Sequence, residues 1–382
     1  MRWLLPPGIE DLLPPQAQAL EGARRRLLDL FAAWGYRLVM PPLVEYADAL
    51  LTGTGADLAQ QTFQVTDPLS GRLLAIRADI TPQVARIDAR DSDPAPARLC
   101  YLGSVLTAQE AAPSACRNPM QVGAELYGHG GPESDVEVLR LMLATLRSAG
   151  HDSTHVDLGH VGIFGGLSHA AGLDTDAEHT LFELLQRKAR ADIADFVAGL
   201  GLAPAMRDWF VHLPQCFGPI ERLPALRAML PGVPEPVLAA LDELETISHL
   251  LLRFEPQLPL FVDLAELRGY HYHTGIVFAA YGAGYGQAMA WGGRYDGVGG
   301  VFGRARPATG FSADLKRLLG APAPQALPVL APWSSDPTLT ELVERLRADG
   351  RTVVYELPGS DTGPVGARIV QRDGGWALQD AG

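Results

Sequence analysis

Cysteine, metal-binding histidine patterns and long apolar runs are scarce or absent in this sequence. Its three cysteines, Cys100, Cys116 and Cys216, show no CxxC spacing and cannot all pair, which argues against a disulfide framework and a zinc site. The ten histidines include no HExxH pattern, so we expect no metal and no cofactor. No segment approaches about eighteen consecutive apolar residues, and the amino terminus lacks the apolar run of a signal peptide. These absences predict a globular protein of a reducing compartment, the cytoplasm.

Positive charge is also in short supply. The 382 residues carry a formal net charge of −13, and the sequence pI is near 5.2. A surface that holds a nucleic-acid backbone usually shows a basic face. The compact basic cluster that we find, Arg24–Arg26, lies in a helical pattern and is typical of a solvated helix face. We therefore expect neither a nucleic-acid nor a membrane partner.

What is present is a chain that is 47% hydrophobic and 20% charged, which can bury a large core. Gly35 is suited to end a helix, and two strand patterns that flank Asp67–Gly71 indicate a hairpin. The elements predicted up to residue 149 are helices at 15–34 and 134–149 and strands at 36–40, 63–66, 72–76, 98–105 and 121–127. Strand-rich segments with few helices favour an α+β fold, an antiparallel sheet with helices packed on one side.

The rest of the chain predicts a helical insertion and a small terminal unit. From about 170 to 255 the pattern is nearly all helical, which indicates an insertion into a domain of residues 1–320. Strand character returns at 260 and is expected to continue through 278. The run of alanine and proline at 321–326 predicts a linker. Residues 327–382 then form a small α/β unit with a strand–helix–strand pattern.

The segment Leu267–Phe278 has the composition of a ligand pocket. It holds a guanidinium, two phenols, two imidazoles and two glycines ahead of a short apolar strand. A strand built only for packing would not crowd so many donors and acceptors together, because each buried polar group needs a partner. The other interpretation is a polar strand edge. Further blocks of this kind are Arg77–Thr81, Tyr101–Gly103 with Gln121–Glu125, Gly292–Gly297 and Ala308–Leu318, and each alone can serve turns, caps or ion pairs.

Together and in this order, the blocks resemble the histidyl-tRNA synthetase family over residues 1 to about 320. The similar motifs are the family's opening motif at Gly8–Pro14, its first class II motif at Tyr36–Glu45, its Arg-Pro-Glu-Gly-Thr at Arg77–Thr81, its Arg-Gly-Leu-Asp-Tyr at Arg268–Tyr272 and its third motif at Gly292–Gly297 and Gly310–Leu318. The resemblance implies a class II aminoacyl-tRNA synthetase-like fold, an antiparallel sheet flanked by helices. It also implies a dimer formed through the class II-type interface.

The positions that would hold ATP in this family are changed. An adenylating enzyme must hold the α-phosphate of ATP while a carboxylate attacks it, which needs positive charge where charge develops. The family's second-motif arginines fall on Thr107, Glu110 and Ala115, its neighbouring glutamate falls on Gln109, and Arg117 is the arginine left in the loop. Each such loss typically removes several kcal/mol of transition-state stabilisation. The resemblance therefore implies no synthetase activity and no catalytic residue.

The amino-acid pocket survives better. The resemblance assigns histidine binding to Asp79, Thr81, Gln121, Glu125, Arg268, Tyr272, His273 and Tyr295. One carboxylate can take an α-ammonium group through charge-assisted hydrogen bonds, and a second, with the glutamine, can orient an imidazole. Two positions depart from the family's pattern: His273 replaces a tyrosine, and Asp79 is one methylene shorter than a glutamate.

A synthetase-like dimer without these arginines, and without a full anticodon-binding domain, resembles the regulatory subunits of ATP phosphoribosyltransferase. Members of that family carry the segment Leu267–Gly275 found here. The resemblance implies a subunit that is not itself catalytic. It would activate a short-form catalytic subunit, which joins ATP to phosphoribosyl pyrophosphate in the first step of histidine biosynthesis, and would mediate feedback inhibition by L-histidine. Two alternatives remain open: an active synthetase-like ligase, and a tRNA-sensing synthetase-like module.

Overall fold

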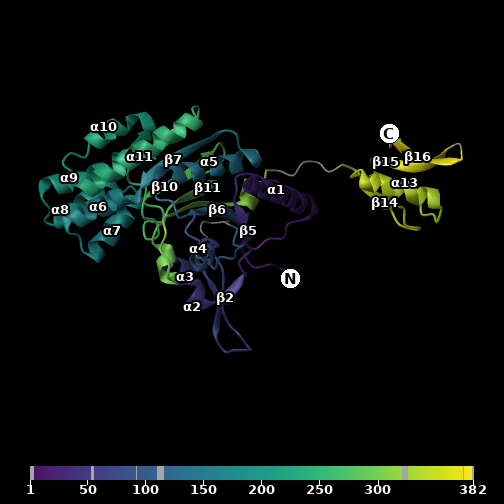
Figure 1. The fold of residues 1–382 in the computed structure, drawn as a ribbon, viewed down its shortest axis with the longest axis horizontal. Helices are drawn as coiled ribbons and strands as arrows, with labels where there is room; N and C mark the ends of the chain where they lie inside the picture. Colours follow the sequence, from purple (N-terminus) through teal and green to yellow (C-terminus); the bar gives the residue numbers. More distant parts are fainter. Residues whose placement is uncertain are drawn as a thin grey trace. The chain divides into compact units, whose positions relative to one another are not determined.

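The computed structural model describes residues 4–52, 56–91, 93–109, 116–320, 326–372 and 374–380 (Figure 1). The chain divides into a large unit that ends at Gly320 and a small unit after it, and each is described by itself. The predicted linker falls mostly on residues 321–325, which lie outside the described residues. Within the described part of the chain, no helix is long and apolar enough to cross a membrane.

A nine-stranded sheet forms the centre of the large unit. Its strands, in spatial order, are β1 (Arg37–Leu38), β5 (Ala97–Ser104), β6 (Met120–Tyr127), β12 (Ala308–Asp314), β11 (Ala290–Arg294), β10 (Ile276–Gly282), β7 (Thr154–His160), β9 (Leu260–Asp263) and β8 (Phe217–Pro219). Neighbouring strands are antiparallel except for β1 with β5 and β7 with β9. The predicted antiparallel sheet is therefore present, with two parallel pairs in it.

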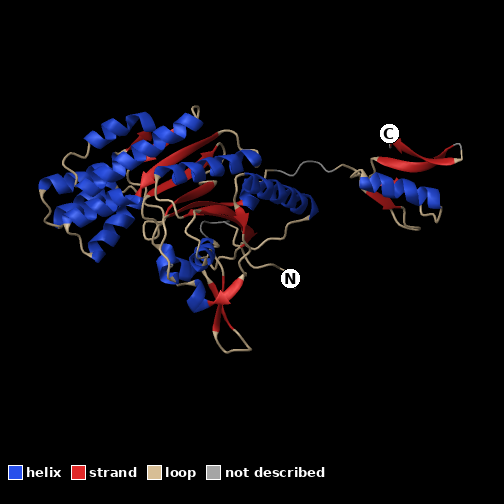
Figure 2. Ribbon diagram, viewed as in Figure 1, coloured by secondary structure: helices blue, strands red, loops and turns tan. Residues whose placement is uncertain are grey.

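One face of this sheet is apolar and covered by helices. Residues along a strand point alternately to its two faces, so Val122, Ala124 and Leu126 of β6 face the main core, where all three are buried. The helices whose apolar residues share this core include α1 (Pro14–Ala33), α5 (Pro132–Ser148) and α11 (Glu235–Phe254). Figure 2 shows these helices packed along the strands. The alternate residues of β6, Gln121 and Glu125 among them, face the other side, where the candidate site lies.

The helical insertion follows β7. Its elements are α6 (Val161–Ala171), α7 (Thr175–Gln186), α8 (Arg190–Gly199), α9 (Pro204–His212), two short 3-10 helices, α10 (Leu223–Ala228) and α11. The insertion also contains β8, which pairs with β9 at the edge of the large sheet. This strand is absent from the sequence prediction, because a three-residue strand with proline and glycine has no recognisable alternation.

A second, three-stranded sheet has the order β2 (Val44–Tyr46), β4 (Leu73–Ile76), β3 (Phe63–Thr66). The hairpin predicted around Asp67–Gly71 is thereby confirmed, since β3 pairs with β4 in antiparallel register. Short helices flank this sheet: α2 (Ala47–Leu50), α3 (Ala56–Gln61) and α4 (Thr81–Arg90). α4 matters most for the site, because its amino-terminal end carries two of the predicted pocket residues.

The small unit is a four-stranded sheet with one helix. The sheet has the order β14 (Val353–Tyr355), β13 (Val329–Ala331), β15 (Ala367–Arg372), β16 (Gly375–Asp380), and the helix is α13 (Pro337–Ala348). Leu339 and Val343 of α13 are fully buried in a core that Val329 and Ile369 share. The predicted strand–helix–strand pattern is thus present, and this unit closes a hydrophobic core of its own.

The strand predicted from 260 through 278 is interrupted. β9 and β10 are strands at its two ends, but residues 264–275 form turns between them. Gly269 adopts a left-handed φ of 64°, which favours glycine. Its carbonyl accepts hydrogen bonds from the N–H groups of Tyr272 and His273, both at 2.8 Å. The polar segment is therefore neither a strand nor a strand edge.

Candidate functional site: a buried carboxylate among tyrosines

Glu125 of β6 lies at the centre of a buried cluster of hydroxyl groups. Glu125 is 1% exposed to solvent. Tyr101 of β5 donates a hydrogen bond to Oε1 at 3.1 Å, and Tyr295, directly after β11, donates one to Oε2. The Tyr101 hydroxyl also lies 3.0 Å from Thr81 Oγ1, and the Tyr295 hydroxyl lies 3.3 Å from that of Tyr127. The sheet thus brings three of the predicted pocket residues, Thr81, Glu125 and Tyr295, into one network.

Glycines on neighbouring strands make room for this cluster. Gly310 pairs with Glu125 across β12 and β6, and a Cβ at Gly310 would lie 1.5 Å from Glu125 Oε2. Gly123 pairs with Tyr101, and a Cβ there would lie 2.4 Å from the Tyr101 hydroxyl. These close approaches require glycine, so the two positions belong to the site although they carry no functional group.

A second polar group lies at the amino-terminal end of α4. Gln121 Nε2 donates to Asp79 Oδ1 at 2.7 Å, and Gln121 Oε1 accepts from the Ile80 N–H at 2.9 Å. The Thr81 N–H donates to the same Asp79 oxygen at 3.0 Å. Asp79 Oδ2 accepts no hydrogen bond from the described residues, which leaves one carboxylate oxygen for a ligand.

The turn after β9 supplies a further side of the site. The Tyr272 ring stacks on Tyr295 with centroids 5.1 Å apart, and its buried hydroxyl has no hydrogen-bond partner among the described residues. His273 Nδ1 lies 3.2 Å from the Gly269 carbonyl oxygen. Burial lowers the pKa of His273 to about 4, so its ring is neutral near pH 7. Because Nδ1 faces an acceptor, it carries the proton, and Nε2 is left as an acceptor.

Arg268, the remaining predicted pocket residue, is directed elsewhere. Its guanidinium donates to the Tyr281 hydroxyl at 3.0 Å and lies 3.8 Å from Glu266 Oε2. It makes no described contact with the Glu125 cluster. Tyr281 of β10, rather than the buried carboxylate of Glu125, therefore holds the Arg268 side chain in position.

Two other arginines of the synthetase-like motifs hold the fold together. Arg77, 6% exposed, donates to the backbone carbonyls of Ser104 at 2.9 Å and Pro41 at 2.7 Å. Arg294, 5% exposed, forms an ion pair with Asp135 at 2.6 Å. Both guanidinium groups are occupied by partners within the protein, so neither is available to a ligand.

At the positions where the resemblance predicts lost ATP contacts, the described residues Thr107 and Gln109 are uncharged. The Thr107 N–H donates to the Arg117 carbonyl at 2.9 Å, and Arg117 Nε donates back to the Thr107 carbonyl at 3.0 Å. The arginine left in this loop is therefore bonded to the backbone. Gln109 is exposed, and Glu110 and Ala115 lie outside the described residues.

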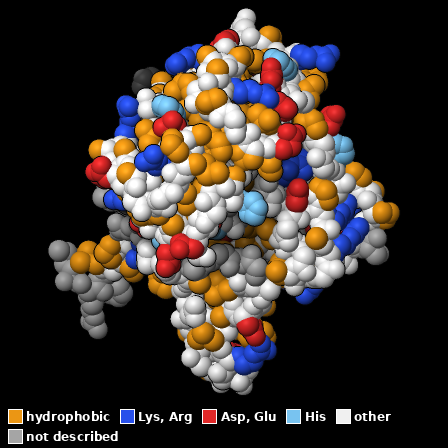
Figure 3. All heavy atoms as spheres, turned by 90° about the vertical axis from the view of Figure 1, so that its left-hand side faces the viewer, with side chains coloured by type: hydrophobic (Ala, Val, Ile, Leu, Met, Phe, Trp, Pro, Cys, Tyr) orange, Lys and Arg blue, Asp and Glu red, His pale blue; other side chains and the backbone are white. Residues whose placement is uncertain are grey.

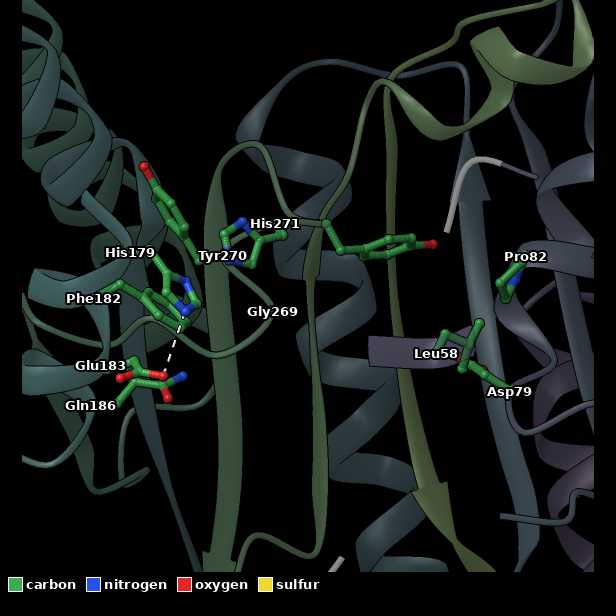
Figure 4. A pocket seen from close by; sticks show the side chains of 11 residues that line it. Leu58, Asp79, Pro82, His179, Phe182, Glu183, Gln186, Gly269, Tyr270 and His271 are labelled. Atoms are coloured by element: carbon green, nitrogen blue, oxygen red, sulfur yellow. Dashed lines mark ion pairs between the residues drawn. The ribbon is translucent and has the colours of Figure 1, made fainter. Parts of the chain in front are cut away.

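A pocket of about 440 Å³ opens beside this cluster rather than within it. Figure 4 shows side chains of α7 and of the turn on one side of it, and Leu58, Asp79 and Pro82 on the other. The lining residues are Leu58, Asp79, Pro82, His179, Phe182, Glu183, Gln186, Gly269, Tyr270, His271 and Tyr272. Of the eight predicted pocket residues, Asp79 and Tyr272 are in this lining.

Burial in a cluster without a cation raises the pKa of Glu125 to about 8, against the hydrogen bonds from Tyr295 and Tyr101, which lower it. In the unfolded chain the group titrates near 4.5, so between these values the folded protein keeps a proton that the unfolded protein releases. The stability that depends on this proton is present below the unfolded pKa and is lost as the pH rises through the folded pKa. The loss reaches about 1.4 kcal/mol per pH unit in that window.

We therefore expect Glu125→Gln to have a flatter pH dependence of unfolding than the unmodified protein, because glutamine cannot titrate. The measurement is urea unfolding at about pH 5 and about pH 8, with Glu235→Gln on the exposed start of α11 as the control. Parallel pH profiles for all three proteins would contradict this interpretation.

Sequence reasoning missed some residues of the site. Tyr101 and Tyr127 belong to the hydrogen-bond network. Tyr101 could have been predicted, because it lies in one of the polar blocks, on the strand paired with β6. Phe182, Glu183 and His179 of α7 had no such signal. They lie in an ordinary amphipathic helix, and only the return of the insertion toward α4 places them at the pocket.

A mostly antiparallel sheet with a buried Glu125 among tyrosines and Gln121 beside it defines a class II aminoacyl-tRNA synthetase-type domain of the histidyl kind. The family model for histidyl-tRNA synthetase matches residues 8–318, and the model for the ATP phosphoribosyltransferase subunit HisZ C-terminal domain matches residues 326–379.

Two curated relatives carry the same name. The ATP phosphoribosyltransferase regulatory subunit of Alkalilimnicola ehrlichii is 54% identical over 99% of this chain and 97% of its own length. That of Pseudomonas syringae pv. syringae is 54% identical over 94% of this chain and 91% of its own length. The chain belongs to the ATP phosphoribosyltransferase regulatory subunit family.

Solved structures agree with the fold. A Bacillus halodurans structure described as an ATP phosphoribosyltransferase regulatory subunit/histidyl-tRNA synthetase has a TM-score of 0.83 at 27% identity and covers 95% of this chain and 94% of that one. Histidyl-tRNA synthetase from Nostoc sp. has a TM-score of 0.78 at 17% identity over 97% of this chain and 91% of that one, a likeness of fold alone.

Proposed function

We propose that this chain is a non-catalytic subunit that activates a short-form ATP phosphoribosyltransferase catalytic subunit and makes it subject to inhibition by L-histidine. The observation that carries the proposal is the buried Glu125, which keeps an amino-acid pocket in a domain whose ATP positions are changed. An effector can shift activity only if it binds one state of the complex more tightly than the other.

In this proposal the ligand's two polar ends meet two carboxylates. Asp79 Oδ2, free of described partners, takes the α-ammonium group, and Gln121 holds Asp79 in place at 2.7 Å. Glu125 faces the imidazole ring. The neutral His273 offers Nε2 as an acceptor, and the unpartnered Tyr272 hydroxyl offers a donor.

The test is reconstitution. We expect co-expression with a short-form catalytic subunit to yield a stable complex whose phosphoribosyl transfer falls when L-histidine is added. The same purified chain should show no histidine-dependent exchange between ATP and pyrophosphate, because the loop arginine is bonded to the backbone. Measurable exchange would favour the alternative hypothesis, that the chain is an active synthetase-like ligase.

A second alternative, a tRNA-sensing module, has less support. Figure 3 shows acidic and basic side chains interspersed over the face that it draws, without a continuous basic surface there. The formal net charge of −13 points the same way. Binding of tRNA at physiological salt would contradict our proposal.

We also propose that the three-stranded sheet and the segment before it form an interface between two copies of this chain. Large apolar side chains are exposed there, and exposed apolar surface of this kind marks interaction sites. They include Leu38, Met40, Leu43, Val44, Tyr46, Val65, Leu69 and Leu73.

We expect Leu73→Glu to shift the protein from dimer to monomer in sedimentation velocity, because it places a charge in an apolar interface. The matched control is Leu357→Glu in the small unit, since Leu357 is 56% exposed and Leu73 is 47% exposed. An unchanged dimer in Leu73→Glu would refute the interface.

A further inference from the structure

The pocket beside the Glu125 cluster has walls from four parts of the large unit: α3, the start of α4, α7 and the turn after β9. We call it the outer chamber and define it by Asp79, Phe182, Glu183, Tyr270 and His271. Figure 4 shows Phe182 and Glu183 on the α7 side together with His271, and Asp79 on the opposite side. At about 440 Å³ it has the size of a small-molecule site.

Aromatic rings form one side of the chamber. The Phe182 centroid lies 5.2 Å from that of His271 and 5.7 Å from that of Tyr270. The Tyr270 hydroxyl donates to Glu178 Oε1 at 2.6 Å, and the Tyr270 ring meets Phe164 edge to face at 5.1 Å. These contacts hold Tyr270 in one orientation, so the aromatic wall is formed before any ligand arrives.

Negative charge faces the same space. Glu183 and Asp79 are both in the lining, and no lysine or arginine is among the described lining residues. Asp79 keeps Oδ2 free of described partners, while Glu183 lies 3.5 Å from His179 Nε2. A chamber of this kind disfavours phosphates and carboxylates. It favours a flat cation, which gains from the ring faces and from the carboxylates together.

We propose that the outer chamber is a second binding site, for a small planar cation of the imidazolium class held against the aromatic wall by the carboxylate of Glu183. The Glu125 cluster supplies none of its lining, whereas Asp79 and Tyr272 line the chamber and also belong to the proposed histidine pocket, which the chamber adjoins. A bound ligand would contact α7, the turn and the start of α4 at once. The helical insertion and the histidine pocket would then be linked through one molecule.

The test uses the full chain at one fixed pH and three probes, with binding measured by calorimetry and ligand-observed NMR. 1,3-Dimethylimidazolium is a permanent cation, 1-methylpyrazole is a neutral ring of similar shape, and AMP is a planar anion. We expect the cation to bind and the neutral ring and AMP to bind at least about 10-fold more weakly. Equal binding of the cation and the neutral ring would overturn the proposal.

Variants locate the binding. Glu183→Gln keeps a polar side chain of the same size but removes its charge. Phe182→Leu keeps an apolar side chain but removes its ring. Each should weaken dimethylimidazolium binding by about 3- to 10-fold. Asp195→Asn removes a charge from the exposed face of α8, outside the lining, and should leave binding unchanged. Equal binding in all three variants, or no binding of the cation to the unmodified chain, would refute the site.

Titration with L-histidine distinguishes the source of the cation. Two equivalents per chain, of which Glu183→Gln loses one, would identify free histidine as the occupant of both sites. One equivalent that Glu183→Gln leaves unchanged, with dimethylimidazolium binding intact, would assign the chamber to another cationic ring. The proposal does not depend on histidine inhibition: Glu125→Gln should weaken that inhibition without weakening the binding of dimethylimidazolium.

Discussion

Replacing Glu125 by glutamine is expected to weaken inhibition by L-histidine by about 10- to 100-fold in the reconstituted transferase complex. Glutamine keeps the shape of the side chain, and its amide oxygen can still accept from one of the Tyr101 and Tyr295 hydroxyls while its NH2 group donates to the other. It cannot ionise, however, whereas the neutral Glu125 can pass its proton to the imidazole of the ligand and then form a charge-assisted hydrogen bond with it. The lost contact is worth about 1.5–3 kcal/mol.

The measurement is the histidine concentration that halves the transferase rate, together with the sedimentation profile of the complex. Gln121→Ala should reduce sensitivity as well, because it releases Asp79 from its 2.7 Å hydrogen bond. Both variants should assemble normally, since Glu125 is buried and Gln121 is half-buried against Asp79 and Ile80. Glu235→Gln, an exposed change on α11, serves as the control. Unchanged inhibition by L-histidine in both site variants would mean that histidine does not bind in this pocket.

The second large effect concerns stability. We expect Arg294→Met to lower the free energy of unfolding of the large unit by about 3–5 kcal/mol, because it leaves the Asp135 carboxylate buried without its cation. The Arg294 and Asp135 side chains are 6% and 1% exposed and lie 2.6 Å apart. Arg294 also donates to Ser134 Oγ at 3.0 Å and to the Gly131 carbonyl at 3.2 Å.

Urea unfolding followed by circular dichroism measures the loss. Arg190→Met, an exposed change at the start of α8, should alter stability by no more than about 0.5 kcal/mol. The double variant Arg294→Met with Asp135→Asn should recover part of the loss, since it removes the unpaired charge. A loss of less than about 1 kcal/mol for Arg294→Met would mean that the pair is not a structural support.

The polar blocks of the sequence contained most of the residues that line the candidate site, but the sequence could not predict which partner each side chain contacts. Arg77, Arg268 and Arg294 look alike in a motif. In the structure Arg77 donates to backbone carbonyls and Arg294 forms an ion pair with Asp135, because the ends of their strands lie beside these groups. Which hydrogen bonds a side chain completes depends on neighbours far away in the sequence.

The segment at 267–278 shows the same division. Its composition was sufficient to mark a pocket, since so many polar groups could not be buried by packing alone. Its conformation was not readable, because apolar residues on both sides resemble one long strand. The left-handed turn at Gly269 sends Tyr272 toward Tyr295 and Tyr270 toward Glu178 on α7. Tyr272 therefore packs on the Glu125 cluster and also lines the outer chamber, whereas Tyr270 lines the chamber alone.

Local pattern was enough for most of the elements and for the synthetase-like class, because periodicity, turn residues and charge are properties of short stretches of chain. The lost ATP contacts stay a prediction. The domain boundary at 321–326 stays a prediction. The neutral state expected of Glu125, the acceptor at His273 Nε2 and the outer chamber came from the fold alone. The state of Glu125 and the chamber depend on burial and on groups that meet across strands and helices more than forty residues apart. The acceptor at His273 depends on its burial and on the turn that brings Nδ1 to the Gly269 carbonyl. Neither burial nor the path of a turn can be summed along a sequence.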